Sequence, residues 1–262
     1  MRKNAPIRGT LLLLWLCALS SMFALSQTLG RQSLEQIVSR MQSVQREARN
    51  NPEYRLLREY KLSVSGADTP SSQVLAEIKY IPPGSKQFSI KQVQGNERGG
   101  KIVRKVLEHE VQMASHSDAF ELTPGNYDFS LLREDVLRGR RCYLLQLSPK
   151  RNATELLRGK AWVDEESFLV LRVEGEPAKN PSWWVKNLYV GIDYGLADGM
   201  WLPLTTRATA ELRLLGPHVL TSEDLQVRAI AQNAAVVPAE SMLSHKRGAR
   251  NSLSTAGVWL PQ

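Results

Sequence analysis

The sequence predicts an α+β protein in which amphipathic helices cover the concave side of one strongly curved antiparallel sheet. Two stretches repeat apolar residues every three or four positions, which is typical of a helix with one buried face. Much of the remaining chain alternates apolar and polar residues, which is typical of antiparallel strands with one wet face. Glycine-containing turns separate the later strands, so strands that follow one another in sequence are expected to pair.

The first 26 residues have the pattern of a cleavable export signal. Basic residues lie within positions 1–8, an apolar run follows at 11–19, and Ala24-Leu25-Ser26 is a small-x-small cleavage site. An uncleaved membrane anchor is the alternative, but the apolar run is only about half of the ~20 residues that a spanning helix needs. We therefore expect a periplasmic protein that is cleaved near Ser26.

The mature chain is expected to hold one domain and a tail. Residues 27–231 are long enough to bury a single core. From residue 232 to 262, Ala, Ser, Asn and basic residues dominate, and this composition predicts a disordered tail.

The first helix is predicted to begin after Ser33. Ser33 and Gln36 have the spacing of a capping box. The apolar residues that follow share one face: Leu34, Ile37, Val38, Met41 and Val44. The helix is expected to stop near Asn50-Asn51-Pro52.

Strands follow this helix. The apolar residues of one parity are Tyr60, Leu62 and Val64, then Val74, Ala76, Ile78 and Tyr80, then Phe88 and Ile90. Pro82-Pro83-Gly84 ends the second of these strands.

A second amphipathic helix is predicted at residues 101–115, and the chain then returns to strand. The apolar residues of this helix are Ile102, Val103, Val106, Leu107, Val111 and Met113. The later strands are predicted at 127–137, 141–148, 157–164, 168–175, 186–194, 202–215 and 218–230. An acidic turn at Asp164 to Glu166 is expected to join two of them into a hairpin.

Charge and cysteine content set limits on partners and chemistry. The formal charge is +8 and falls to +5 when the three basic residues of the signal are removed. An exported protein of this balance meets anionic lipid head groups more readily than nucleic acid, although a mild basic excess is also common on solvated surfaces. Cys142 is left alone after cleavage, so no internal disulfide forms, and its apolar surroundings favour a packed core residue.

No catalytic or metal-binding constellation is apparent. His109-Glu110 begins like a zinc-protease motif, but position 113 is Met where the second His is needed. Neither a Gly-x-Ser-x-Gly elbow nor a phosphate loop occurs, and Gly99-Gly100-Lys101 is interpreted as a hairpin turn. We therefore expect no enzyme activity, no cofactor and no metal.

Aromatic residues are concentrated in one part of the chain. Between positions 162 and 201 the sequence places Trp162, Trp183, Trp184, Tyr189, Tyr194 and Trp201. Such residues either fill a core or line a ligand surface. The core interpretation is favoured for Trp162, whereas the ligand surface fits Trp183-Trp184, because consecutive residues of an extended segment point to opposite faces.

Several motifs resemble bacterial outer-membrane lipoprotein-sorting proteins, whose fold is similar to that of LolA, LolB and the N-terminal part of MucB/RseB. The motifs are Arg58-Glu-Tyr60, Ile81-Pro-Pro83, Val103-Arg-Lys-Val-Leu107, Asn126-Tyr-Asp-Phe129, Arg158-Gly-Lys-Ala-Trp-Val-Asp164 and Glu176-Pro-Ala-Lys-Asn-Pro-Ser-Trp-Trp-Val185. Together they span most of residues 33–230.

The resemblance implies an unclosed half-barrel with helices as a lid over an apolar cavity for acyl chains. It implies no catalysis. Arg58 and Arg104 are the candidates for an arginine that latches the lid. The residues expected to line the cavity and lid are Ile37, Met41, Tyr60, Leu62, Ile78, Tyr80, Phe88, Val106, Met113, Trp162, Trp183, Trp184, Tyr189 and Trp201.

The expected function is that of a periplasmic carrier or binding protein for lipid or lipoprotein acyl chains. Its expected partners are these chains, membrane-bound donor or acceptor proteins, and a membrane surface in transient contact, but not nucleic acid. The alternative is an RseB-like envelope-stress sensor that binds a protein partner, although the segment after residue 232 is short for the second domain of such sensors. An exported hydrolase is a third possibility.

Overall fold

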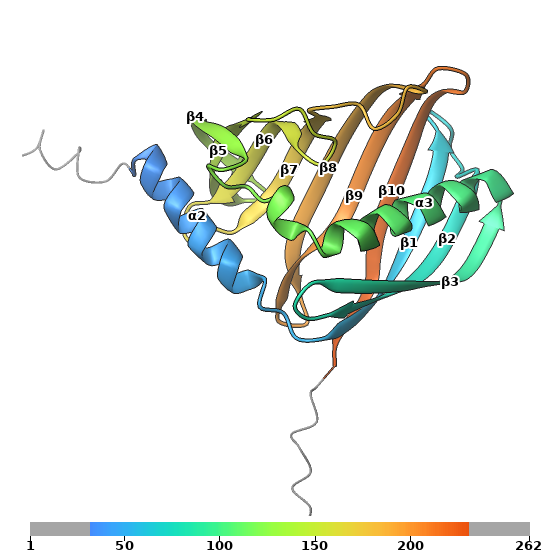
Figure 1. Cartoon of the computed structure of the whole chain (residues 1–262), viewed down its shortest axis with the longest axis horizontal. Coiled ribbons are helices and arrows are strands. Elements are labelled where there is room, and N and C mark those ends of the chain that lie inside the picture. Colours follow the sequence, from blue (N-terminus) through green and yellow to red (C-terminus); the bar gives the residue numbers. More distant parts are fainter. Residues whose placement is uncertain (1–31, 231–262) are drawn as a thin grey trace, which may run out of the picture.

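The computed structural model describes residues 32–230, and these form one open sheet with two covering helices (Figure 1). The predicted signal at 1–26 and the predicted tail at 232–262 lie outside the described residues. The helices are α2 (Leu34–Ala48) and α3 (Glu97–Ala114), with a short 3-10 turn, η1 (Ser117–Ala119). The strands are β1 (Tyr54–Val64), β2 (Ser72–Ile81), β3 (Ser85–Gly95), β4 (Tyr127–Leu137), β5 (Arg140–Pro149), β6 (Leu157–Asp164), β7 (Val170–Pro177), β8 (Val185–Ala197), β9 (Met200–Leu212) and β10 (Gly216–Ala229).

The strands form a single antiparallel sheet in the order β3-β2-β1-β10-β9-β8-β7-β6-β5-β4. Strands that follow one another in sequence pair, except that β10 returns to pair with β1 and that β3 and β4 form the two edges. The sheet is therefore not closed into a barrel. The predicted α+β half-barrel with a helical lid is confirmed.

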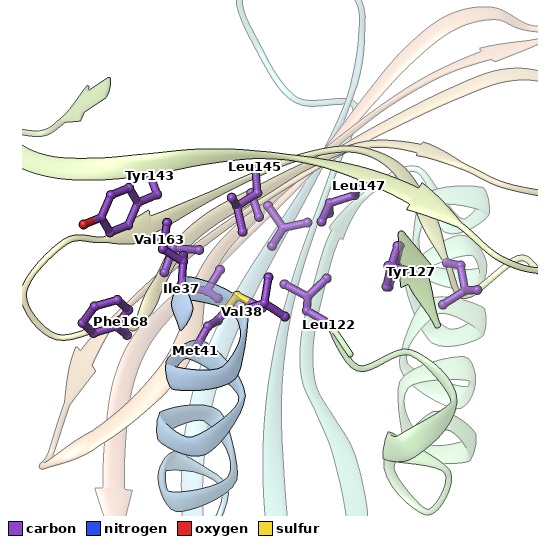
Figure 2. Packing of buried hydrophobic residues seen from close by; sticks show 14 residues of the cluster. Ile37, Val38, Met41, Leu122, Tyr127, Tyr143, Leu145, Leu147, Val163 and Phe168 are labelled. Atoms are coloured by element: carbon purple, nitrogen blue, oxygen red, sulfur yellow. The ribbon is translucent and has the colours of Figure 1, made fainter. Parts of the chain in front are cut away.

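Helix α2 covers one half of the sheet. Its N-terminus is a capping box, in which the Gln36 amide donates to the Ser33 hydroxyl over 3.2 Å and the Gln36 side chain accepts from the Ser33 amide over 3.0 Å. Figure 2 shows Ile37, Val38 and Met41 pointing from this helix toward Leu145, Val163 and Phe168. These residues form the first core cluster, which joins α2 to β4–β7.

Helix α3 covers the other half. Val103 and Leu107 are buried against Tyr60, Val74 and Ile78, and this second core cluster joins α3 to β1, β2 and β9. Among the described residues, no helix is long and apolar enough to cross a membrane.

The interpretation of Gly99-Gly100 as a hairpin turn is wrong, because both residues lie in α3. A Cβ atom on Gly99 would lie 2.3 Å from the Cβ of Ser72, and one on Gly100 would lie 3.1 Å from a methyl carbon of Val93. The two glycines therefore allow the helix to approach β2 and β3 closely, and this packing outweighs the low helix propensity of glycine.

The hairpin predicted around Asp164 is confirmed, with a longer turn than expected. The Asp164 carboxylate accepts from the Ser167 amide and hydroxyl over 2.8 and 2.7 Å and from Arg140 Nε over 2.8 Å. Phe168 has a φ of 57° and belongs to the turn rather than to the strand, which begins at Val170.

Candidate functional site

Both helices lie on the same face of the sheet, which we call the inner face. Residues opposite one another in paired antiparallel strands project to one side. A row of such opposite residues runs from β1, which packs against α3, to β5, which packs against α2. Its members are Tyr60, Ser222, Thr206, Ile192, Val173, Ala161 and Leu145. The inner face is therefore continuous from one core cluster to the other.

Between the two clusters lies an apolar strip that neither helix buries. It consists of Leu188, Val190 and Ile192 on β8, Ala208 and Ala210 on β9, and Leu220 on β10. All six are half-buried, and only Leu220 packs against a core cluster. We call this set the inner strip. Apolar and small side chains left half-exposed on the concave side of a sheet are the feature of this fold that suits an apolar ligand.

Helix α3 has an apolar side that points away from the edge strand β3. Gly100 faces Val93 of the edge strand β3, so that side of the helix points toward the edge of the sheet. At ~100° per residue, Ile102, Val106 and Met113 lie on the opposite side of the buried Val103–Leu107 stripe. We infer that they face β1 and β10. Val106 is exposed, and the residues that seal α3 onto the sheet are Val103 and Leu107.

A buried ionic network connects α3 to the sheet at this place. Arg58 of β1 is on the inner face, with Nη1 3.1 Å from Glu110 Oε2 of α3. Its Nη2 donates to Asp224 Oδ2 of β10 over 3.2 Å, and its Nε also donates to the Asp224 carboxylate. Lys86 of β3 completes the network, with Nζ 2.6 Å from Glu110 Oε1. These four charged groups connect α3, through Glu110, to β1, β3 and β10. Of the two arginines predicted as latch candidates, Arg58 is the one that forms an ion pair between the sheet and α3.

Glu110 is predicted to contribute stability that is lost in acid. Burial alone would raise the pKa of Glu110, but Lys86 and Arg58 lower it from 4.5 to about 2. The unfolded state then binds more protons between these values, so the free energy of unfolding should fall as the pH falls from about 4.5 toward 2. Urea titrations at several pH values should show that the free energy of unfolding falls less with decreasing pH in Glu110→Gln than in the wild type. Glu108→Gln, at an exposed position of the same helix, should keep the wild-type dependence.

Most of the predicted cavity residues from the first half of the chain are on the inner face. Ile37 and Met41 are buried in the first cluster, and Tyr60 and Ile78 in the second. Tyr80 and Phe88 are half-buried against the second cluster, and Leu62 is buried near Gly99 at the start of α3. Met113 is half-buried on α3. Most of these side chains therefore lie in or against the core clusters on either side of the inner strip.

The prediction that Trp162 lines the cavity is wrong. Its neighbours Ala161 and Val163 point into the first cluster, so Trp162 faces the outer side of the sheet. There its indole N–H donates to Asp135 Oδ2 over 3.1 Å, and the Arg172 guanidinium lies 6.0 Å from the centre of its ring. Trp162 therefore packs the back of the sheet.

The prediction that Tyr189 and Trp201 line the cavity is also wrong, because alternation along the strands places both side chains on the outer face of the sheet. Tyr189 lies between Leu188 and Val190 of the inner strip and is exposed on the outer side. Trp201 lies between Met200 and Leu202 of the second cluster, and its indole donates to the Val170 carbonyl over 3.0 Å. Trp183 and Trp184 lie in the turn before β8 and are exposed.

The sequence interpretation missed Glu110, Asp224 and Lys86, together with the inner strip. Arg58 carried a usable signal, because it alternates with Leu56 and Tyr60 and so had to point inward. A charge at an inward position requires partners, but sequence spacing does not identify residues 52 and 166 positions away. Among the described residues no cluster of His, Cys, Asp or Glu suits a metal ion.

Comparisons with solved structures return the group of proteins that the sequence motifs resemble. An outer membrane lipoprotein-sorting protein domain from Vibrio parahaemolyticus is 14% identical over 80% of this chain and 98% of that chain, with a TM-score of 0.42. The LolA superfamily protein NE2245 from Nitrosomonas europaea is 12% identical over 72% and 93%, with a TM-score of 0.36. MucB from Pseudomonas aeruginosa, solved with MucA, is 12% identical over 74% and 99%, with a TM-score of 0.23.

At 12–14% identity and TM-scores of 0.23–0.42, these similarities say nothing about the ligand or function of this chain. Residues 113–216 also match the model of a family described as "-like: Uncharacterized protein". No curated protein matches the sequence.

Proposed function

We propose that this chain is a non-catalytic periplasmic binding protein or carrier for the acyl chains of lipids or lipoproteins. The observation that carries the proposal is the inner strip, a row of half-buried apolar side chains on the concave face between two helices. Each methylene removed from water there contributes about 0.8 kcal/mol, so one acyl chain lying along the strip supplies a substantial binding energy. The export-signal pattern at residues 1–26 supports the periplasmic location.

The latch between α3 and the sheet fits this role. An acyl chain on the strip needs cover on its second side, and Ile102, Val106 and Met113 supply apolar groups on the near side of α3. Arg58 and Glu110 hold that helix at a fixed height above β1. Loading and release then require α3 to lift, which breaks the ionic network on the helix side and leaves the Arg58–Asp224 pair intact.

The direct test is the lipid content of the protein as isolated. Mass spectrometry of an organic extract of protein purified from its own envelope should find acyl lipids in molar proportion to the chain. Repeated preparations without lipid, together with failure to bind fluorescent fatty acids, would rule the proposal out. Recovery of a protein partner in place of lipid would favour the sensor alternative.

A substitution that fills the inner strip gives a sharper test. Ala208→Trp should lower the affinity for a fluorescent fatty acid by about tenfold or more, because an indole in the middle of the strip excludes several methylenes. The matched control is Arg207→Trp, which adds the same side chain at the next residue, on the outer face. Probe titrations that show equal affinities for the two variants would place the bound chain elsewhere.

A further inference from the structure

Four large apolar side chains are exposed on two neighbouring turns at one end of the sheet. Trp183 is 77% exposed and Trp184 40%, both in the turn that leads into β8. Leu214 is 86% exposed and Leu215 55%, both in the turn between β9 and β10 (Figure 1). We call these four residues the apolar tip. Single exposed leucines are common on protein surfaces, but four large groups on adjacent turns need an explanation.

The two turns are fixed to each other by hydrogen bonds. The Arg213 amide donates to the Trp184 carbonyl over 3.0 Å, and Arg213 Nε donates to the Trp183 carbonyl over 2.7 Å. Val185 and Leu212, which begin and end the adjoining strands, are opposite each other in the sheet and are buried. The backbone beneath the tip is therefore held rigidly, and the exposed side chains stay in water rather than folding back onto the sheet.

We propose that the apolar tip inserts into the surface of an anionic lipid bilayer. A protein partner suits the tip less well, because a standard protein interface has about 20–30 residues a side and the tip offers four large side chains on two turns. Tryptophan and leucine on a protruding element suit the boundary between head groups and acyl chains, where an indole places its ring in the apolar layer and its N–H in the polar one.

The charges around the tip favour an anionic surface. Arg213 is next to Leu214 in sequence and is exposed, and Lys179 is exposed four residues before Trp183. Glu211, two residues before Arg213, is paired with a cation, since Lys186 Nζ lies 2.8 Å from its Oε1 and Asn187 donates to Oε2 over 2.9 Å. The chain without the predicted signal carries a formal charge of +5. Anionic lipids would therefore be attracted rather than repelled as the tip approaches.

The tip lies at one end of the inner strip. Ala210 and Leu188 are opposite each other, two residues before Leu212 and three after Val185. A bilayer in contact with the tip would therefore lie beside the end of the strip. The membrane contact itself does not depend on acyl-chain binding, and the two are tested by different measurements.

The test is sedimentation with vesicles of phosphatidylcholine alone or mixed with phosphatidylglycerol. The protein is exported and purified from a bacterial envelope, and its N-terminus is checked by mass spectrometry, so that the apolar run at residues 11–19 does not confuse the result. The wild type should bind the mixed vesicles, and added salt should weaken this binding. Leu214→Ser and Trp183→Ser should each weaken it about tenfold.

The matched control is Leu196→Ser, which changes an equally large exposed leucine at the opposite end of β8. It should leave vesicle binding unchanged. All three variants should keep the wild-type unfolding midpoint and affinity for the fatty-acid probe, which separates this inference from the proposed function. Absence of vesicle binding, equal loss in Leu196→Ser, or light scattering that shows a wild-type dimer dissociated by Leu214→Ser would overturn the proposal.

Discussion

Replacing Arg58 with alanine is expected to lower the free energy of unfolding by about 3–5 kcal/mol, because it leaves buried anions without their cation. Asp224 is the more severely affected, since its side chain is fully buried and the Arg58 guanidinium bonds to both of its oxygens. Glu110 keeps Lys86 and is 24% exposed, so its loss is partly offset. Urea unfolding followed by circular dichroism at neutral pH measures the effect.

Arg104→Ala is the control for this prediction. Arg104 is the other arginine considered as a latch, and it is exposed on α3. Its removal should change the free energy of unfolding by less than about 0.5 kcal/mol. If the two variants were equally stable, the buried network would have no part in holding the fold. Arg58→Lys should fall between them, because an ammonium group keeps the charge but loses the two-pronged geometry toward Asp224.

Gly159→Ala is expected to destabilise the protein by about 3 kcal/mol, at the upper end for an overpacked site. Gly159 of β6 is directly opposite Gly175 of β7, and a Cβ atom on Gly159 would lie 1.9 Å from the Glu174 carbonyl oxygen and 2.6 Å from the Gly175 Cα. Both obstacles are backbone atoms, so no side-chain rotation relieves the clash. The strands must separate, and the packing of Ala161 and Val163 beneath α2 is disturbed.

Gly125→Ala provides the comparison. Gly125 is also outside the helices, but its added Cβ would meet only the Thr123 hydroxyl, at an ordinary 3.5 Å. The thermal midpoint of Gly125→Ala should stay within about 2 °C of the wild type, whereas that of Gly159→Ala should drop by several degrees. Similar midpoints for the two variants would mean that β6 and β7 can separate to accommodate a methyl group at little cost, contrary to this prediction.

Local sequence patterns were sufficient for the elements of this fold. The strands predicted at 127–137 and 157–164 have the observed bounds, and the apolar spacing from Leu34 to Val44 identified α2. These features depend on residues a few positions apart. The half-barrel required the family resemblance as well, because alternation alone does not state whether a sheet closes.

The errors arose where distant parts of the chain decide the outcome. Trp162 is on a well-predicted strand, but its face is set by which neighbours α2 covers. Gly99 and Gly100 resemble a turn until the approach of α3 to β2 and β3 is known. The partners of Arg58 come from β3, α3 and β10, and only the fold brings them together. The inner strip is defined by what fails to cover it, which no local pattern records.

The division of the apolar interior into two clusters has a mechanical consequence. Each helix is bound to its own group of strands, α2 to β4–β7 and α3 to β1, β2 and β9, and the inner strip lies between the two groups. A sheet resists bending least where no helix stiffens it, and the part that lies between the two clusters is the inner strip. A change in the curvature of the sheet there alters the spacing between the helices without disrupting the packing beneath either one. We therefore expect bending at the inner strip to change the distance between α2 and α3 while both core clusters stay packed.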